Sequence, residues 1–206
     1  MPRAFSELTF TPTVRAHQER MGSAKTYAKF IESGPQQGHL IGDAEKAFIE
    51  ARDGFYQSTV SETGWPYVQY RGGPTGFLKA LGPQSIGYAD FSGNKQYISR
   101  GNLDGNDRIA LILMDYANQR RLKILGRVEF TEGKDAAASL YPDGSEAPAE
   151  RAVIIRVEAL DWNCPRHITP RFTEAELRPH LNTLGRQLAE LKAENERLKQ
   201  EVANSG

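Results

Sequence analysis

The central part of the chain alternates apolar and polar residues in short runs, the pattern of β-strands that bury one face. Aromatic and β-branched residues are concentrated in these runs, and glycine, proline or acidic residues separate them. Short spacings and tight turns favour an antiparallel barrel over a parallel doubly wound sheet, in which helices would alternate regularly with strands. We expect strands over residues 55–61, 66–70, 77–81, 85–90, 108–115, 122–129 and 152–160.

Helical spacing of apolar residues occurs mainly before the strand region. The first predicted helix stops before the break at Gly34, and the second has Asp43 as its N-cap and leads directly into the first strand. Residues 141–149 are rich in proline, glycine and acidic side chains, which predicts an exposed connection. The helices predicted up to this point cover residues 14–31, 44–52, 94–103 and 134–140.

The end of the chain has a different pattern, with spacings of three and four typical of heptad a and d positions. Asn195 occupies one of the a positions. The segment is either a short coiled coil or an amphipathic helix that packs on its own barrel, and Pro179 and Gly185 weaken its first turns. The preceding residues 161–180 contain three prolines and three arginines, so no continuous basic helix of a DNA-binding zipper can form. The heptad positions are Leu181, Leu184, Leu188, Leu191, Asn195, Leu198 and Val202.

Composition narrows the class of protein. The 206 residues suit one domain with appendages, and 26 basic against 26 acidic residues leave no general field for nucleic acid or an anionic membrane. The apolar runs are too short to span a bilayer and the N-terminus lacks a secretory pattern, so we expect a soluble cytoplasmic protein. The single Cys164 excludes an intramolecular disulfide, and the four scattered histidines show no metal-ligand spacing.

A first candidate binding segment lies at the end of the second predicted strand. Arg71 is followed at once by Gly72 and Gly73, whose lack of side chains lets a large ligand approach the backbone amides. The segment could hold a ring or a phosphate. It could equally form a bulge at a barrel corner, with Arg71 on the surface.

A second candidate segment, residues 90–96, ends a strand and opens a predicted helix. Backbone amides, the Ser92 hydroxyl and the Lys95 ammonium could converge there on an anion, for which phosphate is the natural choice. The alternative is an ordinary helix start in which Ser92 or Asn94 serves only as N-cap.

Two further groups of residues could contribute to a site. Arg121 and Lys123 share one face of a strand, and both could reach a shared ligand if that face meets a partner subunit; otherwise they are a solvated strand end. Trp162, Cys164 and His167 lie in one irregular segment, where each is individually explained as a structural residue. Nothing else marks Cys164 as a nucleophile.

Four stretches in order resemble the pyridoxamine 5'-phosphate oxidase-like family of FMN-binding split barrels, in particular its predicted flavin-nucleotide-binding branch. The resemblance runs over residues 55–171 and implies a mainly β, α+β fold, an FMN-binding antiparallel split β-barrel with flanking helices. The C-terminal coiled-coil helix is expected from the heptad spacing alone. The expected FMN-binding domain therefore covers residues 55–171. Helical spacing on either side predicts an N-terminal helical segment over 1–54 and a C-terminal helix, a coiled coil in the first of its two interpretations, over 172–206. The stretches that carry it are residues 64–74, 89–99, 120–126 and 162–165.

The resemblance also assigns residues to the cofactor. Arg71 and Lys95 would neutralise the phosphate, and Ser92, Asn94 and Gln96 would hydrogen-bond phosphate or ribityl oxygens. The glycine pair would face the isoalloxazine ring. The full set is Gln69, Tyr70, Arg71, Gly72, Gly73, Phe91, Ser92, Asn94, Lys95, Gln96, Arg121, Lys123 and Trp162.

In this family the neighbouring subunit completes the site, so the resemblance implies a homodimer with the flavin at the subunit interface. Arg121 would reach the ring from that subunit, and Trp162 would help to close the site. The oxidase itself has a basic residue where this chain has Pro74, and its terminal arginines are spaced differently from Arg166 and Arg171. These departures argue against a pyridoxamine-phosphate substrate and leave FMN binding in place.

Two functions agree with these observations. One is a flavoenzyme that moves a hydride or electrons between FMN and a small molecule. The other is a carrier or sensor that holds a flavin nucleotide without turnover. The sequence identifies no catalytic residue for either function, and it indicates no metal site.

Overall fold

The computed structural model describes residues 2–32, 38–141, 149–162 and 164–204. By its contacts the chain divides into two compact units. One comprises residues 1–115 and 119–168, and the other comprises residues 116–118 and 169–206. None of the helices in the described ranges is long and apolar enough to cross a membrane.

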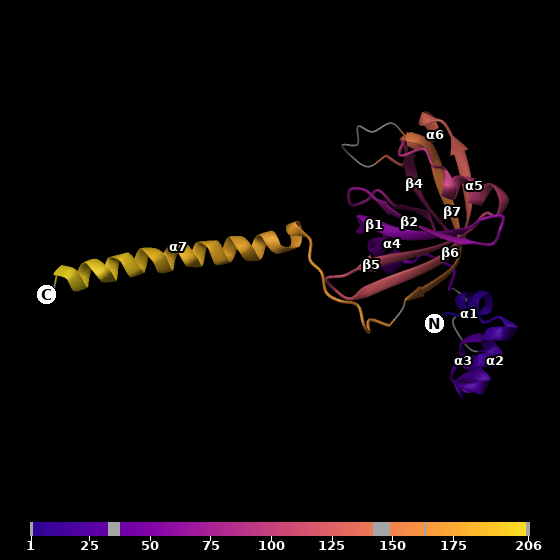
Figure 1. Cartoon of the computed structure of the whole chain (residues 1–206), viewed down its shortest axis with the longest axis horizontal. Helices are drawn as coiled ribbons and strands as arrows, with labels where there is room; N and C mark the ends of the chain where they lie inside the picture. Colours follow the sequence, from indigo (N-terminus) through magenta and orange to yellow (C-terminus); the bar gives the residue numbers. More distant parts are fainter. Residues whose placement is uncertain (1, 33–37, 142–148, 163, 205–206) are drawn as a thin grey trace. The chain divides into compact units, whose positions relative to one another are not determined.

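The first unit is built on one seven-stranded antiparallel sheet with the order β2-β1-β5-β6-β7-β4-β3 (Figure 1). The sheet is not closed, because β2 and β3 each have only one neighbouring strand. The predicted antiparallel strands and fold class are confirmed. The strands are β1 Gly54–Val60, β2 Pro66–Gly72, β3 Lys79–Gly82, β4 Ser85–Phe91, β5 Arg108–Asp115, β6 Arg120–Glu132 and β7 Ala149–Trp162.

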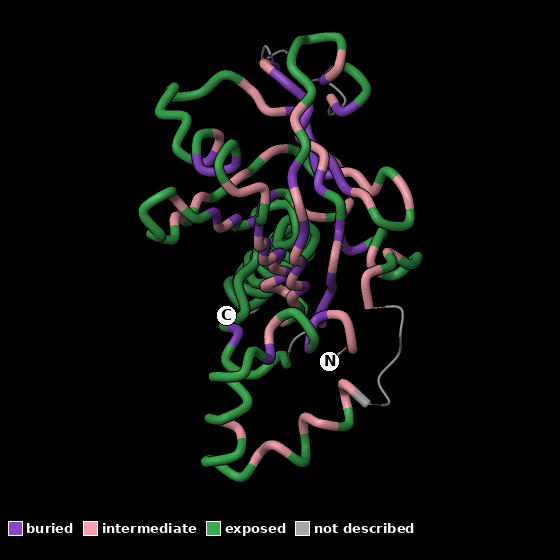
Figure 2. The backbone as a smooth tube through the Cα atoms, turned by 90° about the vertical axis from the view of Figure 1, so that its right-hand side faces the viewer, coloured by how far each residue is buried: buried purple, intermediate pink, exposed green. Residues whose placement is uncertain are grey.

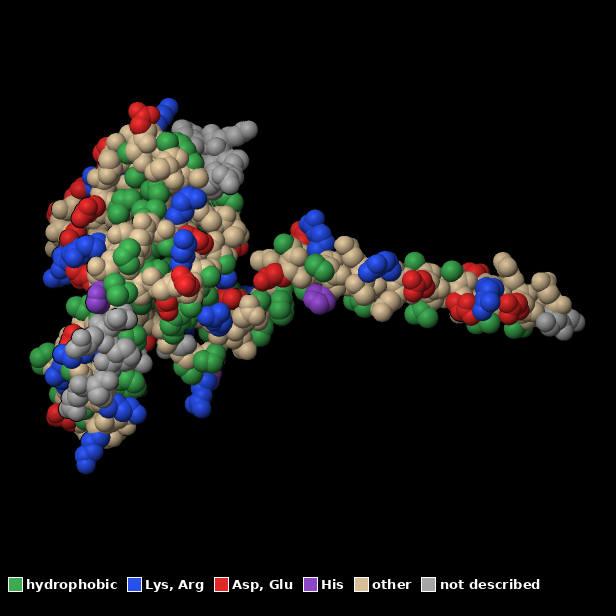
Figure 3. All heavy atoms as spheres, turned by 180° about the vertical axis from the view of Figure 1, so that it is seen from behind, with side chains coloured by type: hydrophobic (Ala, Val, Ile, Leu, Met, Phe, Trp, Pro, Cys, Tyr) green, Lys and Arg blue, Asp and Glu red, His purple; other side chains and the backbone are tan. Residues whose placement is uncertain are grey.

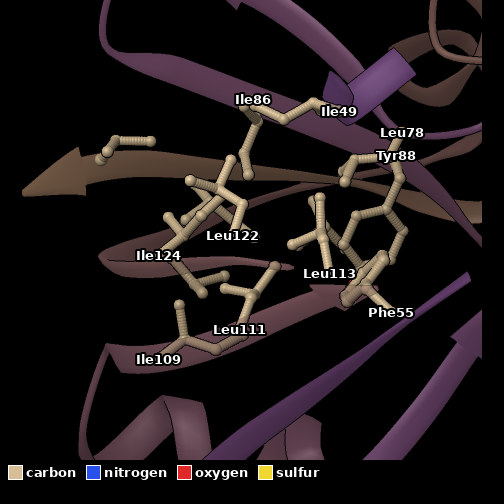
Figure 4. Packing of buried hydrophobic residues seen from close by; sticks show 14 of the residues in the cluster. Ile49, Phe55, Leu78, Ile86, Tyr88, Ile109, Leu111, Leu113, Leu122 and Ile124 are labelled. Carbon is tan, nitrogen blue, oxygen red and sulfur yellow. The ribbon is translucent and has the colours of Figure 1, made fainter. Parts of the chain in front are cut away.

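The core follows directly from the alternation that predicts the strands. Every second residue of β5 and of the first part of β6 is buried, so Leu111, Leu113 and Ile124 point to one side of the sheet (Figure 4). They pack against Phe55 and Ile155 from neighbouring strands. Burial of each such side chain contributes about 1.5–3 kcal/mol to the stability of the fold. Figure 2 shows the buried positions along the strands.

The N-terminal region differs from the single helix predicted over residues 14–31. Two helices, α2 Pro12–Arg20 and α3 Ala24–Glu32, replace it, and an unpredicted helix, α1 Arg3–Thr9, precedes them. The break falls at Gly22, whose φ of +74° is the left-handed conformation that ends helices. Apolar spacing continues across this turn, which is why the pattern suggested one helix.

The other helices agree more closely with expectation. Helix α4 spans Asp43–Glu50, and its N-cap is Gly42 rather than Asp43, because the Glu45 carboxylate accepts a hydrogen bond from the Gly42 N–H at 3.1 Å. Helix α6 spans Lys134–Ala138. Most of the connection predicted over 141–149 lies outside the described residues.

Helix α5 spans Ile98–Gly105 and therefore begins four residues later than predicted. The segment between β4 and α5 is a loop in which Lys95 and Tyr97 have positive φ values of 58° and 53°. Residues in this conformation cannot belong to a right-handed helix. The predicted anion-binding residues 92–96 therefore lie in a loop and outside the helix.

In the second unit, helix α7 runs from Glu174 to Asn204 and continues through Pro179 and Gly185. The predicted C-terminal helix therefore forms, including the turns that these two residues were expected to weaken. Its first turn is supported by the Thr173 hydroxyl, which accepts a hydrogen bond from the Glu176 N–H at 3.2 Å. No described residue of α7 is buried.

The register shift between β6 and β7 requires a glycine. A Cβ at Gly126 would lie 2.6 Å from the Arg156 carbonyl oxygen, so we expect Gly126→Ala to lower the free energy of unfolding by about 1–3 kcal/mol. Gly101 in α5 is the control: its Cβ would meet nothing within 4 Å, and Gly101→Ala should be neutral or stabilising by up to about 1 kcal/mol. Urea denaturation measures both, and equal effects would contradict the packing argument.

Candidate functional site

A cavity of about 220 Å³ lies between β2 and the loop that joins β4 to α5. Tyr67, Gln69 and Arg71 contribute the β2 side, because alternate residues of a strand face the same way. Glu150, from the start of β7, completes the wall. The opposite side consists of Asp90, Phe91, Gly93, Asn94, Lys95, Gln96, Tyr97, Ile98, Ser99 and Arg100.

An ion pair joins the two sides of this cavity. Arg71 Nη1 lies 2.9 Å from Asp90 Oδ1, although four other strands separate β2 from β4 in the sheet order. The contact is possible because the sheet curls until its two ends approach each other. Arg151 Nε lies 3.8 Å from the other carboxylate oxygen of Asp90.

The electrostatics of this cluster combine burial with opposite charges. Burial raises the pKa of Asp90 above its ordinary value, and the neighbouring Arg71 and Arg151 partly oppose that shift. Arg71 also retains a hydrogen-bonding group without a partner, because its Nε is buried and makes no hydrogen bond. A donor in that state favours an additional acceptor nearby.

A buried network of polar side chains adjoins the cavity and supports its wall. Gln57, only 2% exposed, donates from Nε2 to Ser99 Oγ at 3.2 Å and accepts from the Tyr88 hydroxyl at 3.1 Å. Ser99 in turn donates to Gln69 Oε1 at 2.8 Å. The network connects β1, β4 and α5, and it fixes the orientation of Gln69 at the cavity wall.

The sequence analysis missed Gln57, Tyr88 and Ser99. A signal was present, because Gln57 stands at an inward position of β1, between the buried residues Phe55 and Thr59. A polar side chain on the buried face of a strand needs a partner, and that requirement points to a network.

The loop after β4 is conformationally strained. Lys95 and Tyr97 both adopt the left-handed conformation, which costs a residue other than glycine about 1–3 kcal/mol. Asn94 stabilises the bend, because its Oδ1 accepts a hydrogen bond from the Gln96 N–H at 3.1 Å. The bend places Asn94, Lys95 and Gln96 at the wall of the cavity.

The structure thus brings together six of the predicted site residues at the cavity, and the other seven do not line it. Ser92 belongs to the same loop but does not line the cavity. The six that line it are Gln69, Arg71, Phe91, Asn94, Lys95 and Gln96.

Tyr70, Gly72 and Gly73 have a packing role within the chain. The Tyr70 ring lies 5.3 Å from the Tyr56 ring, and a Cβ at Gly72 would come within 2.9 Å of Tyr70. A Cβ at Gly73 would come within 2.7 Å of the Phe77 ring. The absence of side chains at both glycines therefore makes room for the chain's own aromatic rings.

Arg121 and Lys123 do not reach the cavity within one chain. Lys123 lines a second, apolar cavity of about 250 Å³, where its Nζ lies 5.9 Å from the centre of the Phe5 ring of α1. Tyr56 and Val68 line the same cavity. Arg121 pairs with Met114 across β5 and β6, and its Nε is buried without a hydrogen bond.

Trp162 also lies away from the 220 Å³ cavity and attaches α4 to the sheet. Its Nε1 donates to Glu45 Oε1 at 2.7 Å, and its ring meets Phe48 edge-on with centroids 4.7 Å apart. The Arg120 guanidinium lies 4.7 Å from the same ring. Among the residues that the structure describes, no group of three or more His, Cys, Asp or Glu side chains could hold a metal ion.

Solved structures of similar fold show low identity to this chain. A point variant of HupZ from Group A Streptococcus is 20% identical over 60% of this chain and 99% of its own, with a TM-score of 0.49. A putative pyridoxamine 5'-phosphate oxidase from Lactobacillus delbrueckii is 19% identical over 60% and 94%, with a TM-score of 0.47. An FMN-binding protein from Syntrophomonas wolfei is 10% identical over 71% and 97%, also with a TM-score of 0.47.

A comparison with curated proteins gives no match. The family model described as pyridoxamine 5'-phosphate oxidase, by contrast, matches residues 41–164. This range includes all seven strands of the sheet and every residue that lines the 220 Å³ cavity. The chain belongs to the pyridoxamine 5'-phosphate oxidase family.

Proposed function

We propose that this protein binds FMN, with the phosphate against the loop between β4 and α5, and acts as an oxidoreductase on a small molecule. The observation that carries the proposal is that Gln69 and Arg71 from β2 line the same cavity as Asn94, Lys95 and Gln96 from the loop. These two segments are far apart in sequence, and both carry groups that bind phosphate and ribityl oxygens.

The charges around the cavity suit a phosphate. Among the described lining residues, three side chains are basic, Arg71, Lys95 and Arg100, and two are acidic, Asp90 and Glu150. The buried Nε of Arg71 lacks a hydrogen-bond partner, and a phosphate oxygen is a strong acceptor that would supply one. The chain as a whole has no net charge, so this basic excess is local.

The size of the cavity bears on assembly. At about 220 Å³ it is smaller than the roughly 300–1,000 Å³ typical of cofactor sites, so one chain would enclose only part of the nucleotide. We infer that a second copy covers the rest. The outer face of β1 and β2, opposite to the cavity side, offers that copy a surface, because Tyr56, Val68 and Tyr70 are 38%, 62% and 57% exposed there. A copy packed there would reach the cavity past the free edge of β2. Lys123 shares the apolar cavity of that face and would meet the second copy.

FMN, when bound, supplies hydride and electron transfer, while the protein binds and orients it. Gln69 is suited to orientation, because Ser99 holds its side-chain oxygen and leaves its amide nitrogen as a donor toward the cavity wall. Arg71 and Lys95 would fix the phosphate end. Trp162 would contribute indirectly in this proposal, by holding α4 on the sheet.

A carrier or sensor is the second candidate function. The observation in its favour is that no described residue lining the cavity is a histidine or cysteine, so none has an ordinary pKa near neutrality for acid–base chemistry. Anaerobic addition of NADH or NADPH to the FMN-loaded protein separates the two functions. An oxidoreductase that uses such a donor should lose its oxidised flavin absorbance within minutes. If only dithionite reduces the bound flavin, the protein does not accept hydride from NADH or NADPH, and the result supports the carrier or sensor function.

We expect the protein to bind FMN more tightly than riboflavin, because only FMN has the phosphate that Arg71 and Lys95 would contact. Lys95→Asn should weaken FMN binding by about 1–2 kcal/mol, or roughly 5- to 30-fold, and leave riboflavin binding unchanged. Asparagine is chosen because it tolerates the left-handed conformation of Lys95. Flavin fluorescence titration measures both ligands.

Lys134→Asn is the matched control, since Lys134 is exposed and lies outside the cavity. Equal affinity of the parent for FMN and riboflavin would contradict the phosphate role. The same loss in both variants would show that the lysine at position 95 has no special contact.

We expect sedimentation velocity to show a dimer that FMN stabilises, because ligand binding at an interface favours the assembled state. Val68→Glu should weaken both dimerisation and FMN binding by placing a charge on the outer face of β2. Leu81→Glu, at an exposed apolar position of β3, should change neither. A monomer that binds FMN as tightly as the parent would refute the shared site.

A further inference from the structure

Helix α7 presents an apolar stripe to solvent, which Asn195 interrupts. Figure 3 shows hydrophobic side chains at intervals along it, between charged ones. Positions three and four apart fall on one face of a helix, so these side chains form a single seam. Their exposures are Leu181 57%, Leu184 59%, Leu188 54%, Leu191 68%, Leu198 47% and Val202 75%.

We propose that this stripe binds the α7 of a second copy of the chain, in a parallel and in-register two-stranded coiled coil. Leu184, Leu191 and Leu198 occupy the d positions of the seam. Asn195 stands at an a position, within the seam. A buried asparagine costs stability, but it pairs with its symmetry mate when the helices are parallel and aligned, and it thereby specifies register.

The charges beside the seam select the same orientation independently. Glu194 occupies a g position and Lys199 the e position that follows it. In a parallel in-register pair, g of one helix faces the following e of the other, so each Glu194 lies beside a Lys199. In an antiparallel pair, e positions would face e positions and g positions would face g positions. The e-position lysines, Lys192 and Lys199, would then lie beside each other, and so would the g-position glutamates.

Glu194 and Lys199 each have a partner within the same helix, and the parallel arrangement leaves those contacts in place. Glu194 Oε2 accepts from Arg197 Nε at 3.0 Å, and Lys199 Nζ donates to Glu196 at 2.8 Å. Arg197 and Glu196 stand at c and b positions, away from the seam. A helix pair would therefore add contacts between chains to networks that already order the charged side chains.

Cysteine cross-linking in the full-length protein tests the arrangement. With Cys164 replaced by serine, Leu184→Cys and Asn195→Cys each place one thiol at the seam, where symmetry-related cysteines meet in a parallel in-register pair. Under mild oxidation both should form disulfide dimers several-fold faster than Arg186→Cys and Gln200→Cys, which stand at outward f positions. Non-reducing gel electrophoresis measures the rates.

In an antiparallel pair the two Leu184 positions would be about 20 Å apart, so failure of Leu184→Cys to cross-link overturns the parallel orientation. Seam rates no higher than the f-position rates would show that the stripe is covered in another way, for example by the chain's own sheet. The outcome does not depend on flavin, so it is distinguishable from failure of FMN binding.

A charge exchange tests the orientation without new thiols. In the Asn195→Cys background, Glu194→Lys and Lys199→Glu should each slow cross-linking, because like charges then face each other across the seam. The double variant, which restores opposite charges, should recover most of the parent rate. Recovery would support the parallel arrangement, and a double variant as slow as the single ones would contradict it.

Discussion

The ion pair between Arg71 and Asp90 is the contact on which the candidate site depends. It connects two strands near opposite ends of an open sheet through their side chains, and both residues line the cavity. Because the pair and Arg151 are largely buried, the carboxylate lies where solvent screens its charge little. The position of Gln69 relative to the loop after β4 follows from this contact, with the Gln57 network keeping the side chains in place.

Strand alternation made most of the fold predictable from sequence. The inward positions of β5 and β6 are apolar almost without exception, so the sequence showed which face of each strand points into the core. The same reasoning applied to β1 should have identified Gln57 as a buried polar group. Periodicity could not locate the helix break at Gly22 or the late start of α5, since both depend on single residues in the left-handed conformation. Such a conformation has a weak sequence signal when the residue is lysine or tyrosine.

The site itself was predictable as segments and less so as individual side chains. The resemblance placed Arg71 and Lys95 in one site, and the structure puts both at one cavity. It gives the glycine pair and Trp162 contacts within the chain, with Tyr70, Phe77 and the residues of α4. Those contacts depend on which aromatic ring occupies the space beside each residue. Three-dimensional packing determines that choice, and the local sequence does not show it. Arg121 and Lys123 do not line this cavity, and their predicted role from a second copy stays a prediction.

The strained loop after β4 has a consequence for directed evolution of this protein. Glycine or asparagine at positions 95 and 97 would relieve a left-handed backbone that lysine and tyrosine adopt at a cost. A library selected only for heat resistance should therefore enrich these replacements and discard the ammonium group with the strain. Selection for thermostability alone would therefore change a short segment that supplies Asn94, Lys95 and Gln96 to the wall of the cavity.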